Sequence, residues 1–299
     1  MRILITGGSG FIGCNLIPHL LAHQHHVVVL SRNPLRTFKK LGHQIQVCQD
    51  LADFTNFDQF AAVINLAGEP IVSSRWSQAK KNKICQSRWL ITQQLCDKIL
   101  ASHQPPHVFL SGSAVGFYGN QYDTILDEQT PPEEGDFANH VCSTWETLAL
   151  KTQSRTRVCL LRTGLVLGKN GGMFKQLLPV FKAGIGGPLG NGHQYQPWIH
   201  IHDMVHAIEY ILNNPQCHGP FNLTAPNPVT NNQFSKSFAG KLHRPCLFRM
   251  PSFLLKLILG EMSELLLGGQ RAIPDKLNKH GFHFMFKHID EALDDLLKK

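Results

Sequence analysis

The sequence predicts an α/β protein with a doubly wound parallel sheet and a smaller, discontinuous C-terminal lobe. Short apolar runs alternate with stretches that are long enough for helices, which is typical of repeated βαβ units. The run at 27–30 is wholly apolar, as expected for a strand that is buried on both faces. A chain of 299 residues, 42% of them apolar, is also long enough to bury a substantial core.

Most of the predicted strands lie in the first half of the chain. A strand at 2–6 leads into a helix at 11–23, in which Pro18 removes one backbone hydrogen bond and bends the helix without ending it. The other strands are expected at 27–30, 45–48, 62–66, 107–110 and 158–161.

The βα rhythm ends near Gly168, and a segment rich in Gly and Pro follows at 184–192. Beyond it, Asp203 is expected to be the N-cap of a helix that runs through Asn213. The segment 221–224 is expected to return to the sheet as a strand. The very apolar segment 252–267 predicts a helix that packs in the core, with a subunit interface or a membrane surface as the alternatives.

The net charge of +8 comes from 29 basic and 21 acidic residues, and it is unevenly distributed. Six Lys or Arg accompany one acid at 75–103, whereas 121–146 holds seven acids and neither Lys nor Arg. The basic region is expected either to be a solvated helix face or to attract a phosphate-bearing ligand. Because no basic and aromatic stripe accompanies the charge, nucleic acid is not an expected partner.

The eight cysteines are widely spaced and form no C-x-x-C pair, which favours free thiols in a reducing compartment. The chain shows no basic and apolar leader and no run of 18 apolar residues. We therefore expect a cytoplasmic protein without a membrane partner.

A glycine pattern follows the first strand, in the order Thr6-Gly-Gly-Ser-Gly-Phe-Ile-Gly13. Glycines at these spacings allow a tight turn, a close approach of the backbone to a pyrophosphate and close packing of the helix on the strand. The free N–H groups at the start of the helix favour an anion. The pattern predicts a dinucleotide-binding domain at 1–168, with its sheet completed by about 200–225. The cofactor is expected to contact Gly7, Gly10, Phe11, Ile12 and Gly13.

The end of the second strand bears on which dinucleotide binds. Ser31 and Arg32 lie 18 and 19 residues beyond Gly13. An acidic residue here would bind the ribose hydroxyl of NAD, whereas a serine and an arginine suit the additional 2′-phosphate of NADP. The sequence therefore predicts NADP(H), with the alternative that Arg32 is an ordinary surface residue.

These motifs resemble those of the extended short-chain dehydrogenases/reductases, the group that includes nucleotide-sugar epimerases and dehydratases. Asp50-Leu51 resembles the group's acidic turn beside the adenine, and Asn65–Gly68 the segment after its fourth strand. Ser111–Gly119 resembles its active-site serine segment, and Arg162–Gly168 the strand exit beside the nicotinamide. The resemblance implies further cofactor contacts from Asp50, Leu51, Leu66, Ala67, Gly68, Arg162, Gly164 and Leu165.

Three later segments resemble an atypical, epimerase-like branch of this group whose activity is generally unassigned: Gly171–Met173, Trp198–Asp203 and 269–284. The resemblance implies that 169–299 is a substrate lobe, which includes a separate C-terminal domain at about 245–299. Homodimers are common in the group, although no feature of this chain predicts one.

One position departs from the group. A tyrosine followed four residues later by a lysine carries out proton transfer there, and this chain has Cys142 and Glu146 instead. A thiol can act as an acid or base. However, a carboxylate one helical turn away raises the pKa of that thiol, by roughly two units at ~6 Å and an effective dielectric of ~20. Cys142 is therefore interpreted as a small buried apolar residue rather than a reactive thiolate.

Several other groups remain candidates for the site. Ser113, Glu146 and, despite its unfavourable neighbour, Cys142 are the candidates for proton transfer, with Tyr118 and His140 as alternatives. Substrate contacts are expected from Ser113, Tyr118, Trp198 and His200. A metal site at 200–203 is weighed and not expected, because His200 and His202 share a face of a strand whereas Asp203 points away.

Two functions fit these observations. The first is an NADP(H)-dependent oxidoreductase or epimerase that acts on a small hydroxy, carbonyl or nucleotide-sugar substrate without the usual tyrosine and lysine. The second is a non-catalytic NADP(H)-binding protein with a regulatory or redox-sensing role. The retained Ser113 segment favours the first, and the missing pair favours the second. We favour the first, because hydride transfer depends chiefly on how the nicotinamide is positioned.

Replacing Arg32 with Ala is expected to weaken NADPH binding about tenfold or more and to leave NADH binding nearly unchanged. The reason is that only NADPH carries the phosphate that a guanidinium would bind through charge-assisted hydrogen bonds. Calorimetric titration with both cofactors measures the difference. Equal losses for the two cofactors would contradict the assignment.

Overall fold

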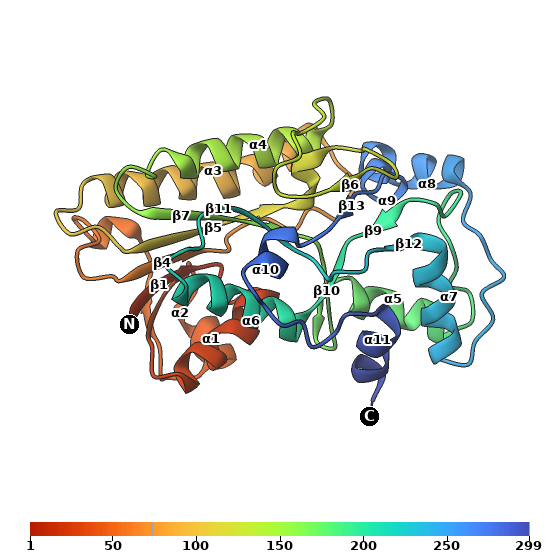
Figure 1. The fold of residues 1–299 in the computed structure, drawn as a ribbon, viewed down its shortest axis with the longest axis horizontal. Helices are drawn as coiled ribbons and strands as arrows, with labels where there is room; N and C mark the ends of the chain where they lie inside the picture. The colour runs from red at the N-terminus through yellow and green to blue at the C-terminus, as the bar shows by residue number, and fades with distance from the viewer. Residues whose placement is uncertain (73, 299) are drawn as a thin grey trace.

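The computed structural model describes residues 1–72 and 74–298, and a seven-stranded sheet lies at its centre (Figure 1). The strand order is β11-β7-β5-β4-β1-β2-β3, and all neighbouring strands are parallel. This is the doubly wound α/β sheet that the sequence predicts. Its strands are β1 (Arg2–Thr6), β2 (His26–Leu30), β3 (Gln46–Cys48), β4 (Ala62–Asn65), β5 (Val108–Ala114), β7 (Arg157–Thr163) and β11 (Gly219–Leu223).

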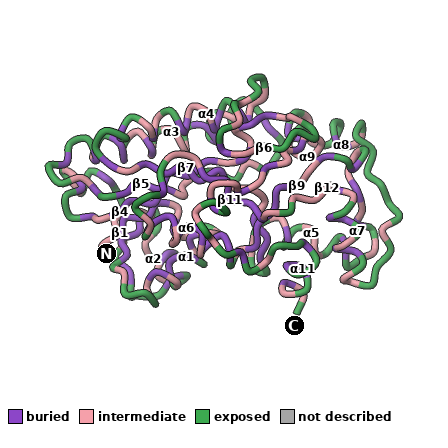
Figure 2. Tube along the Cα trace, viewed as in Figure 1, coloured by how far each residue is buried: buried purple, intermediate pink, exposed green. Residues whose placement is uncertain are grey.

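Helices cover both faces of the sheet. One face carries α1 (Phe11–Ala22), α2 (Pro34–Leu41) and α6 (Ile201–Asn213), and the other carries α3 (Gln78–Leu100) and α4 (Phe137–Leu150) (Figure 1). Successive strand residues point to opposite faces, so Ile3 packs on the α1 side and Leu4 on the α3 side. The buried residues therefore follow the sheet through the middle of the molecule (Figure 2).

Most of the rest of the chain forms a second body beside the carboxyl ends of the strands, whereas η1 (Leu51–Asp53) packs in the core of the sheet. A separate apolar cluster there includes Phe174, Trp198, Phe238 and Leu293. The remaining elements are η1 (Leu51–Asp53), η2 (Val115–Tyr118), β6 (Ile125–Leu126), β8 (Leu165–Gly168), α5 (Gly172–Lys182), β9 (Tyr195–Gln196), β10 (Trp198–His200), β12 (Val229–Thr230), α7 (Asn231–Lys241), α8 (Ser252–Leu259), η3 (Gly260–Ser263), α9 (Glu264–Leu267), β13 (Arg271–Ala272), α10 (Asp275–Lys279) and α11 (Ile289–Leu297).

The prediction for Asp203 was wrong. Helix α6 begins at Ile201, and its N-cap is His200, whose ring accepts a hydrogen bond from the backbone of His202. Asp203 lies in the first helical turn, where its two carboxylate oxygens accept the backbone N–H groups of Met285 and Phe286 at 2.9 Å each. The carboxylate is 1% exposed, so its position is set by the C-terminal tail rather than by the helix end.

The long apolar helix expected at 252–267 is interrupted. Gly260 has φ of +60°, a conformation that L-residues rarely adopt, and it ends α8 before η3 and α9 begin. Within α8, Leu255 is buried, but Phe253 and Leu257 are each 71% exposed, so the expected core packing does not hold. Among the described residues, no helix is both long and apolar enough to cross a bilayer.

Replacing Gly13 with Ala is expected to lower the free energy of unfolding by about 1–3 kcal/mol, because the new Cβ would lie 2.4 Å from the carbonyl oxygen of Gly8. The matched control is Gly240→Ala in α7, where no heavy atom lies within 4 Å of the added Cβ. There the change should raise stability by up to about 1 kcal/mol. Urea denaturation measures both, and similar values for the two variants would count against tight packing at Gly13.

Candidate functional site

A cavity of about 530 Å³ opens at the carboxyl ends of the central strands. Its wall includes Gly7 after β1, Leu66 after β4, Ser113 at the end of β5 and Gly164 after β7. The strand order reverses between β1 and β4, and ligands of doubly wound sheets bind at such a switch point. The cavity is therefore the candidate active site.

The glycine turn forms one end of this cavity. Gly7 has φ of +69°, and a Cβ on it would lie 2.4 Å from the carbonyl oxygen of Leu66, so a larger residue would not fit. Gly10 is the N-cap of α1 and has no side chain to cap the helix, which leaves free N–H groups facing outward. This backbone cradle suits the pyrophosphate of a dinucleotide.

The predicted cofactor contacts divide into two sets. The residues that line the cavity are Gly7, Gly10, Phe11, Ile12, Gly13, Leu66, Gly68, Gly164 and Leu165. Those outside the described lining are Ser31, Arg32, Asp50, Leu51, Ala67 and Arg162.

Most of the predicted cofactor residues outside the cavity lining make hydrogen bonds or packing contacts within the protein. The Ser31 hydroxyl pairs with that of Thr37 at 2.7 Å, and Asp50 caps η1 by accepting the N–H of Ala52 at 2.9 Å. Ala67 donates its N–H to Thr6 Oγ1, Leu51 is buried in the core and Arg32 is exposed. Cofactor contacts from these residues stay predictions.

Arg162 also lies outside the described lining, and the structure buries it. It is 4% exposed, and its Nε and Nη2 donate to the two carboxylate oxygens of Glu146 at 2.9 and 2.8 Å. Its Nη1 donates to the hydroxyl of Tyr118 at 3.0 Å. The guanidinium is thus held by Glu146 and Tyr118, and a cofactor contact from Arg162 stays a prediction.

Cys142 lies in the cavity wall and is 5% exposed. Burial, and to a smaller extent the charge of Glu146, raises the pKa of its thiol to about 12, and Arg88 partly opposes this shift. The expected direction of this shift is confirmed, but burial contributes more than the neighbouring carboxylate. The thiol is therefore protonated at neutral pH and is unsuited to be a general base.

Ser113 connects the cavity to the buried ion pair. Ser113 lines the cavity, and its hydroxyl donates to Glu146 Oε1 at 2.6 Å. A short chain of hydrogen bonds thus runs from the cavity through Ser113 to Glu146 and on to Arg162. Ser113 and Glu146, both expected to take part in proton transfer, lie in direct contact.

Three residues expected to contact substrate lie outside the described lining. Tyr118 is fully buried, its hydroxyl donates to Asn222 at 2.8 Å, and burial raises its pKa to about 12. Trp198 is also fully buried and donates to the backbone of Asn227. His200 caps α6, and burial lowers its pKa to about 4. These side chains make contacts within the framework of the protein, and substrate contacts from them stay predictions. His140 is exposed and packs against Trp89.

Sequence reasoning missed several residues of the wall, above all Arg88, the one charged side chain among the described lining residues. Burial lowers the pKa of its guanidinium. The Nη1 atom donates to the backbone of Glu69 and Ile84, and the group lies 5.4 Å from the ring centre of Trp145. The basic region at 75–103 was the available signal. The charge of this region alone could not show which of its basic side chains faces a cavity and which faces solvent. Tyr195, Leu265, Leu266, Gly268 and Gln270 also line the cavity.

Comparison with known proteins agrees with this geometry. The model of the NAD dependent epimerase/dehydratase family matches residues 3–223, and that of a domain of unknown function, DUF1731, matches 250–296. A chloroplastic SDR39U1 homolog of Arabidopsis thaliana is 38% identical, covering 100% of this chain and 87% of the relative. The epimerase family protein YfhF of Bacillus subtilis is 36% identical over 99% and 98%.

Solved structures share the fold. The crystal structure of human epimerase family protein SDR39U1 (isoform2) with NADPH has a TM-score of 0.91 and 33% identity over 99% of both chains. A UDP-glucuronic acid 4-epimerase from Bacillus cereus has a TM-score of 0.77 at 17% identity, which supports the fold alone. The chain therefore belongs to the NAD-dependent epimerase/dehydratase family and carries the DUF1731 domain at its C-terminal end.

Proposed function

We propose that this protein is an NADP(H)-dependent oxidoreductase or epimerase that acts on a small hydroxy or carbonyl substrate. The observation that carries the proposal is the single cavity shared by the glycine turn, Ser113 and the C-terminal segment around Leu266. In such a cavity a cofactor held on the glycine turn would meet a substrate bound at Ser113. NADP(H) is preferred over NAD because of Ser31 and Arg32, and a human relative was crystallised with NADPH.

In the proposed reaction, different residues would bind the cofactor, bind the substrate and transfer the proton. The amides of the glycine turn would hold the pyrophosphate, and the nicotinamide, when bound, would supply or accept a hydride. Ser113 Oγ binds the reacting oxygen of the substrate. In alcohol oxidation the substrate hydroxyl gives its proton to Ser113 while Ser113 passes its own proton to Glu146. Carbonyl reduction runs in reverse, and Arg162 keeps the Glu146 carboxylate turned towards Ser113.

Arg88 suggests the class of substrate. A half-buried guanidinium in a wall that is otherwise apolar or neutral attracts an anionic group. We propose that the substrate carries a carboxylate or a phosphate. A nucleotide sugar can carry both, because an oxidised sugar has a carboxylate and the link to the nucleoside is a diphosphate. Arg88 would then orient the substrate against Ser113.

Turnover is tested by the loss of NADPH absorbance when the pure protein is mixed with a panel of acidic sugars, aldehydes and quinones. For any substrate found, Ser113→Ala should lower kcat at least about 100-fold while the affinity for NADPH stays the same. The control is Ser111→Ala, which lies on the same strand with its side chain outside the described cavity lining. Tyr195→Phe should retain most of the activity. A large loss in that variant alone would instead make Tyr195 the proton donor.

One observation favours the second candidate, a non-catalytic NADP(H)-binding protein. Both carboxylate oxygens of Glu146 already accept from Arg162, and the Cys142 thiol is protonated, so both side chains are engaged in structural roles. NADPH binding in calorimetry without turnover of any compound in the panel would support this candidate and contradict the enzymatic one.

Replacing Glu146 with Gln is expected to lower the free energy of unfolding by about 3–5 kcal/mol. The amide keeps the shape of the side chain but leaves the charge of Arg162 buried without a counterion. The control is Glu134→Gln at an exposed position, which should change stability by no more than about 0.5 kcal/mol. Chemical denaturation compares the two, and equal stabilities would show that the ion pair adds nothing to the fold.

A further inference from the structure

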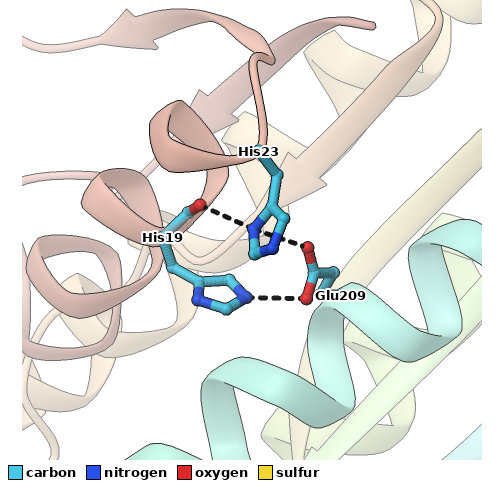
Figure 3. A group of neighbouring side chains, drawn as sticks. All are labelled: His19, His23 and Glu209. Carbon is cyan, nitrogen blue, oxygen red and sulfur yellow. Dashed lines mark hydrogen bonds and ion pairs between the residues drawn. The ribbon is translucent and has the colours of Figure 1, made fainter.

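A cluster of histidines lies between α1 and α6, away from the candidate active site. His19 lies in the last turn of α1, and His23, four residues later, is the C-cap of the same helix, so the two side chains lie on the same side. Glu209 projects from α6 towards both of them, and the two imidazole rings and the carboxylate point at one another across the helix interface (Figure 3). We call these three residues the α1–α6 cluster.

The distances in the cluster are those of potential ligands. His19 Nε2 lies 2.6 Å from Glu209 Oε2, and His23 Nδ1 lies 3.1 Å from Glu209 Oε1. One ligand atom from each of the three residues fits within a mutual distance of 4.8 Å. Ligand atoms around a tetrahedral zinc ion lie about 3.3 Å apart, given bonds of about 2.0–2.1 Å. Because Nδ1 of His23 is already hydrogen-bonded, Nε2 of that ring would bind the ion, and the side chains would have to turn to bring it to the other two ligand atoms.

The surroundings already orient one of the rings. His23 Nδ1 lies 3.0 Å from the carbonyl oxygen of His19, and because both of its neighbours are acceptors, this nitrogen carries the proton. The other ring nitrogen, Nε2, then keeps its lone pair. Histidines that bind metals commonly donate their second N–H to a backbone carbonyl in this way.

The cluster is also open to solvent and extends into more imidazoles. Glu209 and His206 line a cavity of about 600 Å³ together with His202 and His283. The ring of His206 lies 4.6 Å from that of His19 and 3.9 Å from that of His202, measured between centroids. An ion can thus enter from this side, and His206 is positioned next to the cluster.

We propose that the α1–α6 cluster binds a divalent transition metal of the zinc class. Two imidazoles and one carboxylate match the ligands that zinc prefers, and a water molecule would complete four-coordination. Binding would displace the proton shared by His19 and Glu209. The ion would join α1, whose first turn faces the dinucleotide cavity, to α6, and so stabilise the pairing of these helices.

The test uses full-length protein without an affinity tag, stripped with a chelator, and zinc chloride as the probe at pH 7.5. Calorimetry should give one site, and zinc at about 100 times Kd should raise Tm by about 5 °C. His19→Ala, His23→Ala and Glu209→Gln should each weaken binding by more than about tenfold. The matched control is His103→Ala, at an exposed position outside the cluster, which should bind zinc as the unchanged protein does.

Cobalt as a second probe reads the geometry directly, because a tetrahedral site gives intense visible absorption that Glu209→Gln should abolish. The isosteric Glu209→Gln variant also keeps the test valid if a histidine variant folds poorly. Zinc binding that survives all three cluster substitutions would overturn the proposal. So would binding that is lost in His25→Ala and retained in His19→Ala, since His25 lies nearby in the loop after α1.

Discussion

The buried ion pair of Arg162 and Glu146 is the interaction on which the two parts of the molecule depend. Arg162 extends from β7 and Glu146 from α4, and the Tyr118 hydroxyl links the guanidinium to Asn222 on β11. The Asn222 amide then donates to the backbone of Ile273 in the C-terminal tail. Because a charge at this depth is costly without a partner, each member requires the others to be in place. The sheet and the tail are thereby held in one arrangement.

This network also explains the exchange of residues on α4. In the group that the chain resembles, these two positions carry a tyrosine and a lysine that transfer protons. Here Cys142 is a buried thiol in the cavity wall, and Glu146 serves as the counterion of Arg162. The residue at the position of the lysine therefore has a structural role in this protein. Ser113 remains as the polar residue that contacts both the cavity and the Glu146 carboxylate. The proposed chemistry follows from that remaining contact.

Much of the fold could be predicted from the sequence because its signals are local. Parallel strands buried on both faces read as apolar runs, and the segments of β1, β2 and β4 were found on that basis. The glycine turn was equally clear, since spacing alone indicates where the backbone must come close to a ligand. Predictions that assumed a local role for a polar residue were less successful. Asp203 looked like a helix cap, but it binds the backbone of a segment about 80 residues later.

The sequence by itself determined the class of fold, the dinucleotide turn and the absence of the tyrosine and lysine pair, because each of these depends on residues close together in the chain. Only the tertiary structure decided that Arg162 pairs with Glu146, that Arg88 faces the cavity and that Tyr118, Trp198 and His200 are buried in the framework. It also brought Glu209 to His19 across 190 residues of sequence. The physical reason is that the cost of burying a charge depends on neighbours that folding, rather than spacing, supplies.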